Sequence, residues 1–386
     1  MENFVFHNPT KLVFGKDTVE KIGEELRKNG IKKVLMIYGG GSIKKNGVYE
    51  KVVRSLHDNG ITKVELSGIR PNPVLSKVHE AIAVAKKEQV EAILAVGGGS
   101  VVDSGKAIAA GYYYEGDIWD AFIGKYAVKK ALPLYVVLTM SATGTEMNGN
   151  GVITNEETLE KLGFGSKYVY PVVSIVDPTV QYSLPRDQVV YGAIDAISHV
   201  MEHYFDVAGS ALIDSIDEGI IRTIMSATEK VIEEPENYEA RANLCLATTL
   251  ALNGLTKMGT TGGDWSSHDL QHPLSALKPE VAHGAGLAVV FPAWMTYVRD
   301  LISEKLIKFG KNILNLGDDA TAERTIDELR RWYKSVGAPI TLKELGFTQE
   351  DVQKVTQIAS KHAPLGKVKR LDTHDIESIY RIAYEF

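Results

Sequence analysis

Asp195 and His199 are the residues whose types and spacing most directly suggest chemistry. They stand four positions apart in a segment, residues 188–205, with helical character, and this spacing places both side chains on one face of a helix. Histidine recurs downstream at positions 268, 272 and 283. Three imidazoles and one carboxylate suit Zn²⁺ or Fe²⁺ and disfavour Ca²⁺ and Mg²⁺. The sequence therefore predicts one divalent metal ion, iron or zinc, with the ligands Asp195, His199, His268 and His283.

Two glycine-serine loops each follow a short apolar run. Gly97-Gly98-Gly99-Ser100, with Asp103 three residues on, follows residues 92–96, and Gly39-Gly40-Gly41-Ser42 follows residues 34–38. Glycines at the end of a strand let backbone N–H groups approach a phosphate, and the start of the next helix adds partial positive charge. Neither G-x-G-x-x-G nor the P-loop pattern fits, because Val102 and Ala107 occupy required positions. The pair of loops predicts one extended ligand with phosphates in two places.

The loop at residues 39–42 also bears on which dinucleotide is bound. In dinucleotide domains an acidic residue after a strand commonly binds the adenosine ribose and selects NAD. This loop has no acid, and Lys44 and Lys45 follow it, which leaves room and positive charge for a 2′-phosphate. We expect NADP(H) to be preferred, with NAD(H) possible. A polar loop at residues 139–146 follows another apolar run, where ligands sit in open α/β sheets.

Two other classes of function fit part of these residues. His199-Val200-Met201-Glu202-His203 matches H-x-x-E-H, a motif of one class of zinc peptidase in which both histidines bind zinc and the glutamate is the base. That alternative leaves the glycine-serine loops unexplained. A nucleotide-binding sensor without catalytic activity could use the same loops.

The elements that must position these residues divide the chain in two. Short apolar runs at 34–38, 63–66, 92–96, 134–139 and 172–176 alternate with segments of helical period at 18–28, 48–58, 74–87 and 103–110. This alternation predicts a parallel sheet with helices on both faces. Residues 4–14 suggest a small edge hairpin around Asn8-Pro9. Beyond residue 180 helices follow one another, at 187–206, 211–233, 238–257, 285–300, 319–335, 349–361 and 373–384. We therefore expect an α/β dinucleotide-binding domain at 1–180 and an all-helical, metal-binding domain at 181–386, with the active site in the cleft between them.

The composition indicates in which compartment the protein works and which partners it can bind. The net charge of the 386 residues is -6 and there is no long basic run, so nucleic-acid binding has no electrostatic support. One cysteine, Cys245, and no signal-like N-terminus favour a cytoplasmic protein without a membrane span. We expect a homodimer paired through a sheet edge, because open sheets have edges to cover.

Taken together, the motifs resemble the iron-containing (group III) alcohol dehydrogenases over essentially the whole chain, and the branch of butanol dehydrogenases and NADPH-dependent aldehyde reductases most of all. The resemblance is carried by residues 38–47, Pro71-Asn72-Pro73, residues 97–103, 139–146 and 174–178, Asp195 to His199, and His268 to Gly284. It implies a Rossmann-like N-terminal domain, an all-α C-terminal domain, and hydride transfer between NAD(P)(H) and a small primary alcohol or aldehyde.

The resemblance also implies roles for individual residues. The four predicted metal ligands match the family's ligands by position. The cofactor-binding residues implied are Gly39, Gly40 and Ser42 for the adenosine phosphate, Asn72 for the adenosine half, Gly98, Gly99, Ser100 and Asp103 for the pyrophosphate and ribose, and Thr139, Thr143 and Lys161 for the nicotinamide side. His272 matches a histidine near the substrate, where it either relays a proton or only supports its neighbours.

Overall fold

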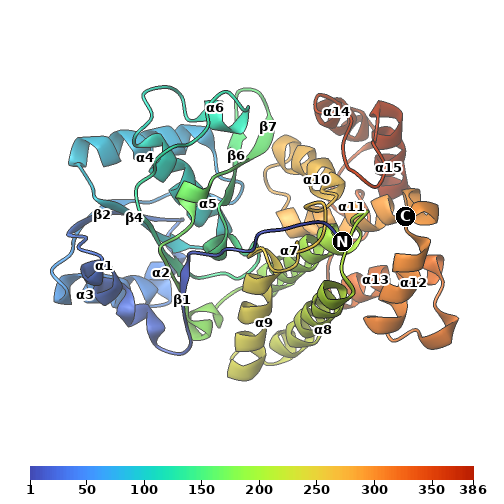
Figure 1. The fold of residues 1–386 in the computed structure, drawn as a ribbon, viewed down its shortest axis with the longest axis horizontal. Helices are drawn as coiled ribbons and strands as arrows, with labels where there is room; N and C mark the ends of the chain where they lie inside the picture. The colour runs from blue at the N-terminus through green and yellow to red at the C-terminus, as the bar shows by residue number, and fades with distance from the viewer. The chain divides into compact units, whose positions relative to one another are not determined.

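The computed structural model describes residues 1–386, which fold into two compact units (Figure 1). The sheet unit comprises His7–Leu184 and Glu234–Cys245, and the helical unit comprises Met1–Phe6, Pro185–Glu233 and Leu246–Phe386. The division therefore differs from a single boundary near residue 180. The first six residues belong to the helical unit, and α9 (Tyr238–Ala251) begins in the sheet unit and ends in the helical one.

The sheet unit is built on six parallel strands in the order β1-β8-β5-β4-β2-β3. The strands are β1 (Lys11–Phe14), β2 (Lys33–Tyr38), β3 (Thr62–Leu66), β4 (Ala92–Gly97), β5 (Leu134–Leu138) and β8 (Val173–Val176). All five strands expected from apolar runs are present. The expected N-terminal hairpin is wrong, because β1 pairs in parallel with the distant β8, with Lys11 opposite Val173. β1 and β3 are the sheet edges, and pairing of two copies through an edge stays a prediction.

Helices cover both faces of this sheet. Alternate residues of β2 point to opposite faces: Leu35 belongs to an apolar core that includes residues of α4 and α5, and Val34 to one that includes residues of α1 and α3. The helices are α1 (Ile22–Lys28), α2 (Ser42–Lys45), α3 (Val48–Asp58), α4 (Leu75–Glu88), α5 (Gly99–Gly111) and α6 (Trp119–Phe122). A separate antiparallel hairpin, β6 (Asn150–Asn155) and β7 (Glu160–Gly165), was not expected from the sequence.

The strand order creates a switch point between β2 and β4. From β2 the chain moves to β3 on one side, and from β4 it moves to β5 on the other. Tyr38 lies opposite Val96 in the β2–β4 ladder, so both glycine-serine loops leave the sheet side by side. Ligands of open α/β sheets bind at such a point, outside the carboxyl ends of the strands.

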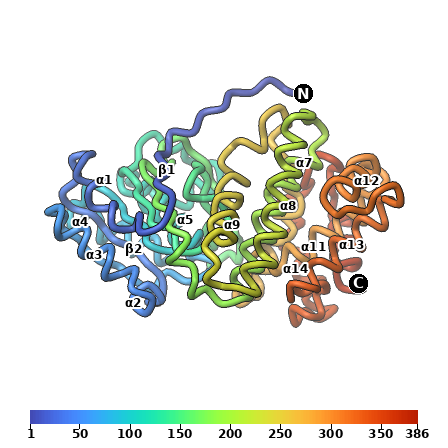
Figure 2. Tube along the Cα trace, turned by 90° about the horizontal axis from the view of Figure 1, so that it is seen from below, coloured from blue at the N-terminus to red at the C-terminus, as the bar shows by residue number.

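The helical unit packs around α11 (His283–Tyr297), which is almost wholly buried and contacts α7, α10, α13 and α15. Its other helices are α7 (Arg186–Tyr204), α8 (Ala211–Glu233), α10 (Ser266–Leu277), α12 (Ser303–Asn312), α13 (Ala322–Val336), α14 (Gln349–Ser360) and α15 (Thr373–Glu385). α7 and α8 run side by side (Figure 2). α10 and α12 were not expected from the sequence. Single 3-10 turns occur in both units, at Thr18–Lys21, Thr145–Met147, Lys167–Val169 and Pro178–Gln181 in the sheet unit and at Arg299–Leu301 and Gly317–Asp319 in the helical unit. No helix combines the length and the apolar character that crossing a membrane requires.

Asp217, on α8, is a buried acid in the helical unit. Its side chain is almost completely buried and its Oδ1 atom has no hydrogen-bond partner. Burial raises the pKa of Asp217 to about 9, the charges of Asp214 and Glu218 add to the shift, and Lys305 and Lys308 oppose it. An unfolded aspartate ionises near pH 4. Between about pH 4 and pH 9 the folded protein therefore keeps a proton that the unfolded chain loses, and this residue disfavours folding more strongly as the pH rises.

Asp217→Asn removes that penalty while keeping the size of the side chain. We expect the variant to be more stable than the wild type at pH 8 by about 2 kcal/mol, or roughly 2–3 °C in Tm for a chain of this length, with a smaller gain at pH 5. Thermal unfolding of both proteins at the two pH values measures this. An equal shift in Tm at pH 5 and pH 8 would contradict it.

Candidate metal centre and dinucleotide loops

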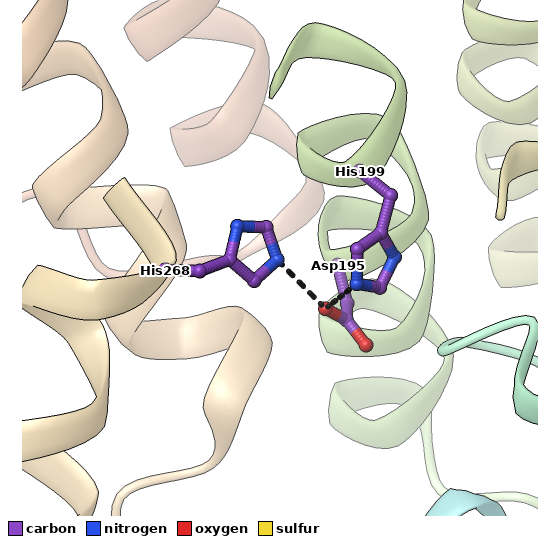
Figure 3. A group of neighbouring side chains, drawn as sticks. All are labelled: Asp195, His199 and His268. Atoms are coloured by element: carbon purple, nitrogen blue, oxygen red, sulfur yellow. Dashed lines mark ion pairs between the residues drawn. The ribbon is translucent and has the colours of Figure 1, made fainter. Parts of the chain in front are cut away.

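Asp195 lies at the centre of the histidine cluster in the helical unit. The Nε2 atom of His199, one turn further along α7, is 3.7 Å from Asp195 Oδ1. The Nε2 atoms of His268 on α10 and His283, the first residue of α11, lie 4.0 and 3.6 Å from the same oxygen. Figure 3 shows Asp195 with His199 and His268, the three buried members that share one candidate metal site. The structure thus brings together all four residues predicted from the sequence as metal ligands.

The spacing of these atoms suits a shared ion better than direct hydrogen bonds. Hydrogen bonds between such atoms span about 2.7–3.2 Å. Two ligands at about 2.1 Å from a tetrahedral ion are roughly 3.4 Å apart, close to the observed 3.6–4.0 Å. Burial lowers the pKa of His199 well below its usual range, and His268 and His203 add to the shift. His199 is therefore neutral, as a metal ligand must be.

Hydrogen bonds on the far side of two rings orient the cluster. Glu202 Oε1 accepts from His268 Nδ1 at 2.8 Å and from the His268 backbone N–H at 3.2 Å, and Glu202 Oε2 accepts from the Trp265 backbone N–H at 2.6 Å. The Nδ1 atom of His283 pairs with Gln271 Oε1, and Gln271 Nε2 donates to Ser275 Oγ at 2.6 Å. A ring that donates from Nδ1 presents the lone pair of Nε2, and this is the arrangement found around metal-binding histidines.

Gly284 allows His283 to reach the cluster. A Cβ atom at this position would lie 1.9 Å from the backbone oxygen of Tyr191 on α7, so only glycine lets α11 begin against α7. Tyr191 is one helical turn before Asp195. The same close approach therefore sets the separation of His283 and Asp195.

Gly284→Ala should push the start of α11 away from α7. We expect lower metal content in the purified protein, because His283 leaves its place near Asp195, and a lower Tm. Metal analysis by mass spectrometry measures the first effect. Gly219→Ala on α8 is the matched control, since a Cβ there meets nothing within 4 Å and alanine stabilises a helix. Full metal content in Gly284→Ala would show that the close approach does not set the site.

His203 and Glu202 do not form the peptidase centre that H-x-x-E-H suggested. His203 Nδ1 pairs with Thr256 Oγ1 at 2.9 Å, and the Glu202 carboxylate is engaged by His268 and Trp265. Among buried residues, only Asp195, His199 and His268 bring their ligand atoms within 4.8 Å of one another, and the buried His203 does not join them. The peptidase alternative is therefore unsupported. Glu202 instead orients His268, a role that the sequence did not signal.

This difference predicts opposite outcomes for two neighbouring substitutions. Glu202→Gln turns one acceptor into an N–H donor that faces His268 or Trp265, and we expect metal affinity to fall by roughly 10–100-fold. His203→Gln should keep metal affinity close to that of the wild type. Competition with a chelator measures both affinities. Weaker binding in His203→Gln than in Glu202→Gln would reverse the assignment.

His272 stands one turn after His268 on α10. It is half-buried, and its ring stacks on His283 with centroids 5.5 Å apart and planes 27° apart. The structure thus places the predicted catalytic histidine beside a predicted metal ligand.

In the sheet unit, the loop at 97–100 packs closely against the loop at 139–146. α5 begins at Gly99, directly after Gly98. A Cβ at Gly99 would lie 2.7 Å from Thr143, and one at Gly98 would lie 3.2 Å from Met140. The predicted pyrophosphate and nicotinamide-side residues are therefore neighbours. The missing side chains of Gly98 and Gly99 leave room there for the side chains of Met140 and Thr143.

The loop at 39–42 is open by contrast. Cβ atoms at Gly40 and Gly41 would meet nothing within 4 Å. Lys44 Nζ lies 5.3 and 4.8 Å from the ring centroids of Tyr38 and Tyr49. This end of the switch point therefore has unfilled space with a cation beside it.

Asn72 and Lys161 meet through the β6–β7 hairpin. Lys161 Nζ donates to Asn72 Oδ1 at 2.9 Å, and Thr154 N–H on β6 donates to the Pro73 carbonyl at 2.8 Å. Asp103 is engaged within the protein, because its two carboxylate oxygens accept from Thr145 Oγ1 and from the Val152 backbone N–H. Contact of these residues with a cofactor stays a prediction.

The chain combines a parallel sheet that has paired glycine-serine loops at its switch point with a helical unit that has an Asp-His₃ cluster. This combination is typical of enzymes that use a dinucleotide together with a metal ion. Comparison with known proteins identifies the family. Residues 9–178 match the model of iron-containing alcohol dehydrogenases, and residues 189–384 match the C-terminal model of the Fe-containing alcohol dehydrogenase family. The chain belongs to the iron-containing alcohol dehydrogenase family.

Relatives cover the whole chain. A probable NADH-dependent butanol dehydrogenase 1 of Bacillus subtilis is 41% identical over 99% of both chains. The NADPH-dependent aldehyde reductase YqhD of Escherichia coli is 36% identical over 100% of this chain and 99% of its own. The crystal structure of NADH-dependent butanol dehydrogenase A from Thermotoga maritima superposes with a TM-score of 0.97 at 56% identity, covering 100% of this chain and 99% of that one.

Proposed function

We propose that this protein is a metal-dependent alcohol dehydrogenase and aldehyde reductase that transfers hydride between NAD(P)(H) and a small primary alcohol or aldehyde of the butanol and butanal type. The observation that carries the proposal is the meeting of three imidazole Nε2 atoms at one oxygen of Asp195, 3.6–4.0 Å away. The names of the relatives support the substrate class.

Asp195, His199, His268 and His283 would hold the metal ion. This donor set accepts either Fe²⁺ or Zn²⁺. Bound there, a divalent ion would supply Lewis-acid polarisation of the alcohol or aldehyde oxygen. The chain's own contribution is to hold the rings of His268 and His283 in fixed orientations through Glu202 and Gln271, so that little reorganisation is needed when the ion and the substrate bind.

His272 is the residue that would carry the proton. An imidazole is suited to proton transfer near neutral pH, and this ring is half-buried beside His283. In alcohol oxidation it would take the proton of the substrate hydroxyl, and in aldehyde reduction it would return a proton to the oxygen. A purely supporting role beside His283 is the alternative.

The switch point of the sheet would hold the dinucleotide. Gly98, Gly99 and Ser100 at the start of α5 would donate backbone N–H groups to the pyrophosphate, and Gly39, Gly40 and Ser42 would face the adenosine phosphate. Asn72 would lie along the adenosine half, and Thr139, Thr143 and Lys161 along the nicotinamide side. Open space at Gly40 and Gly41 with Lys44 nearby favours NADP(H), although the relatives carry names of both kinds.

The test is a set of initial rates with butanal, other aldehydes and the matching alcohols, with NADPH and with NADH, alongside metal analysis of the same sample. We expect a higher kcat/KM with NADPH and iron or zinc near one equivalent. Removing the metal should abolish turnover and leave binding of NADPH largely intact. Full activity in a metal-free sample would exclude the Lewis-acid role, and a higher kcat/KM with NADH would reverse the cofactor preference.

A further inference from the structure

Lys106, on α5, is a completely buried cation that the proposed function does not use. Its ammonium group donates to Thr145 Oγ1 at 2.5 Å, to Asn148 Oδ1 at 2.9 Å and to the Asn150 carbonyl at 2.5 Å. Lysine has three N–H donors, so all of them are satisfied. Burying a charge is costly even when all of its hydrogen bonds are made. The completeness of this network therefore indicates a role beyond filling space.

Thr145 connects this cation to Asp103. Its hydroxyl accepts from Lys106 and donates to Asp103 Oδ1 at 2.6 Å, while Asp103 Oδ2 accepts from the Val152 backbone N–H at 3.0 Å. Burial raises the pKa of Asp103 and lowers the pKa of Lys106 to about 8, and each charge offsets part of the shift of the other. The two charges are therefore interdependent, with a single hydroxyl between them.

The segments that this network joins are those that surround the predicted dinucleotide site. Asp103 and Lys106 are on α5, which begins at the glycine-serine loop. Thr145 is two residues after Thr143, which packs on Gly99. Asn150 and Val152 lie on β6, and Lys161, which donates to Asn72 Oδ1, lies on the partner strand β7.

We propose that Lys106, Thr145 and Asp103 are positioning residues that fix the pyrophosphate loop, the nicotinamide-side loop and the β6–β7 hairpin in one arrangement for dinucleotide binding. The proposal rests on the proposed function. It gives Asp103 an indirect role, through Thr145, in place of contact with the ribose. Loosening the network should weaken cofactor binding, because the loops must then be ordered at the expense of binding free energy. The metal ligands, which lie in the other unit, should be unaffected.

The test compares Thr145→Val, which has the same shape without the hydroxyl, with Thr145→Ser, which keeps it. Both are made in the full chain loaded with metal, and NADPH binding is followed by fluorescence. We expect the Kd and the KM for NADPH to rise by about tenfold in Thr145→Val, as for loss of hydrogen bonds to charged groups. The kcat at saturating NADPH and the metal content should stay near the wild-type values. Thr145→Ser should restore binding to within about twofold of the wild type.

A folded Thr145→Val protein with wild-type Kd would overturn the proposal. If that variant does not fold, Thr145→Ala, which leaves space for a water molecule, is measured in the same way. Loss of fold in both would assign the network to stability alone and would equally overturn it. Wild-type protein that binds neither NADPH nor NADH would instead reject the proposed function itself, so the two failures are distinguishable.

Discussion

The helical unit depends on one constraint, the close approach of three helices around the carboxylate of Asp195. An acid and three imidazoles are expensive to bury unless something compensates for their polarity. Here the compensation is local: each outward-facing ring nitrogen of His268 and His283 has a fixed acceptor, and the inward-facing atoms converge. The helix contacts that hold this geometry are themselves unusual, because a glycine backbone replaces the side chain that would normally separate α11 from α7.

In the sheet unit, the corresponding constraint is that the glycine-rich loops must be held in place. Strand order alone brings the loops after β2 and β4 together. It does not fix the loop at 139–146 or the hairpin that carries Lys161. Those segments are tied to α5 by buried polar contacts centred on Thr145. Both units therefore combine apolar scaffolding with a small buried polar centre, where a wrong side chain costs most.

The sequence predicted much of this arrangement, and the failures have physical causes. Apolar runs located five strands correctly, and the spacing of Asp195 and His199 pointed to the candidate metal cluster on α7. α10, which carries His268 and His272, was missed because its buried face includes Ser266, Ser267 and Gln271 and it contains Pro273, so it lacks an apolar period. The β6–β7 hairpin has glycines within its strands, which weaken the strand pattern. No local pattern could reveal that Glu202 orients His268, since the two are 66 residues apart.

The division of the chain between the two units has a consequence for how the protein is made. The sheet unit needs residues up to Cys245, and the helical unit includes Met1–Phe6. Domains generally fold in turn as the chain leaves the ribosome, yet the N-terminal unit here cannot be completed until α7, α8 and the first part of α9 have been synthesised. No single cut separates the units cleanly. A fragment ending near residue 180 would lack Glu234–Cys245, which belong to the sheet unit, so that unit is completed only after much of the helical unit has been synthesised.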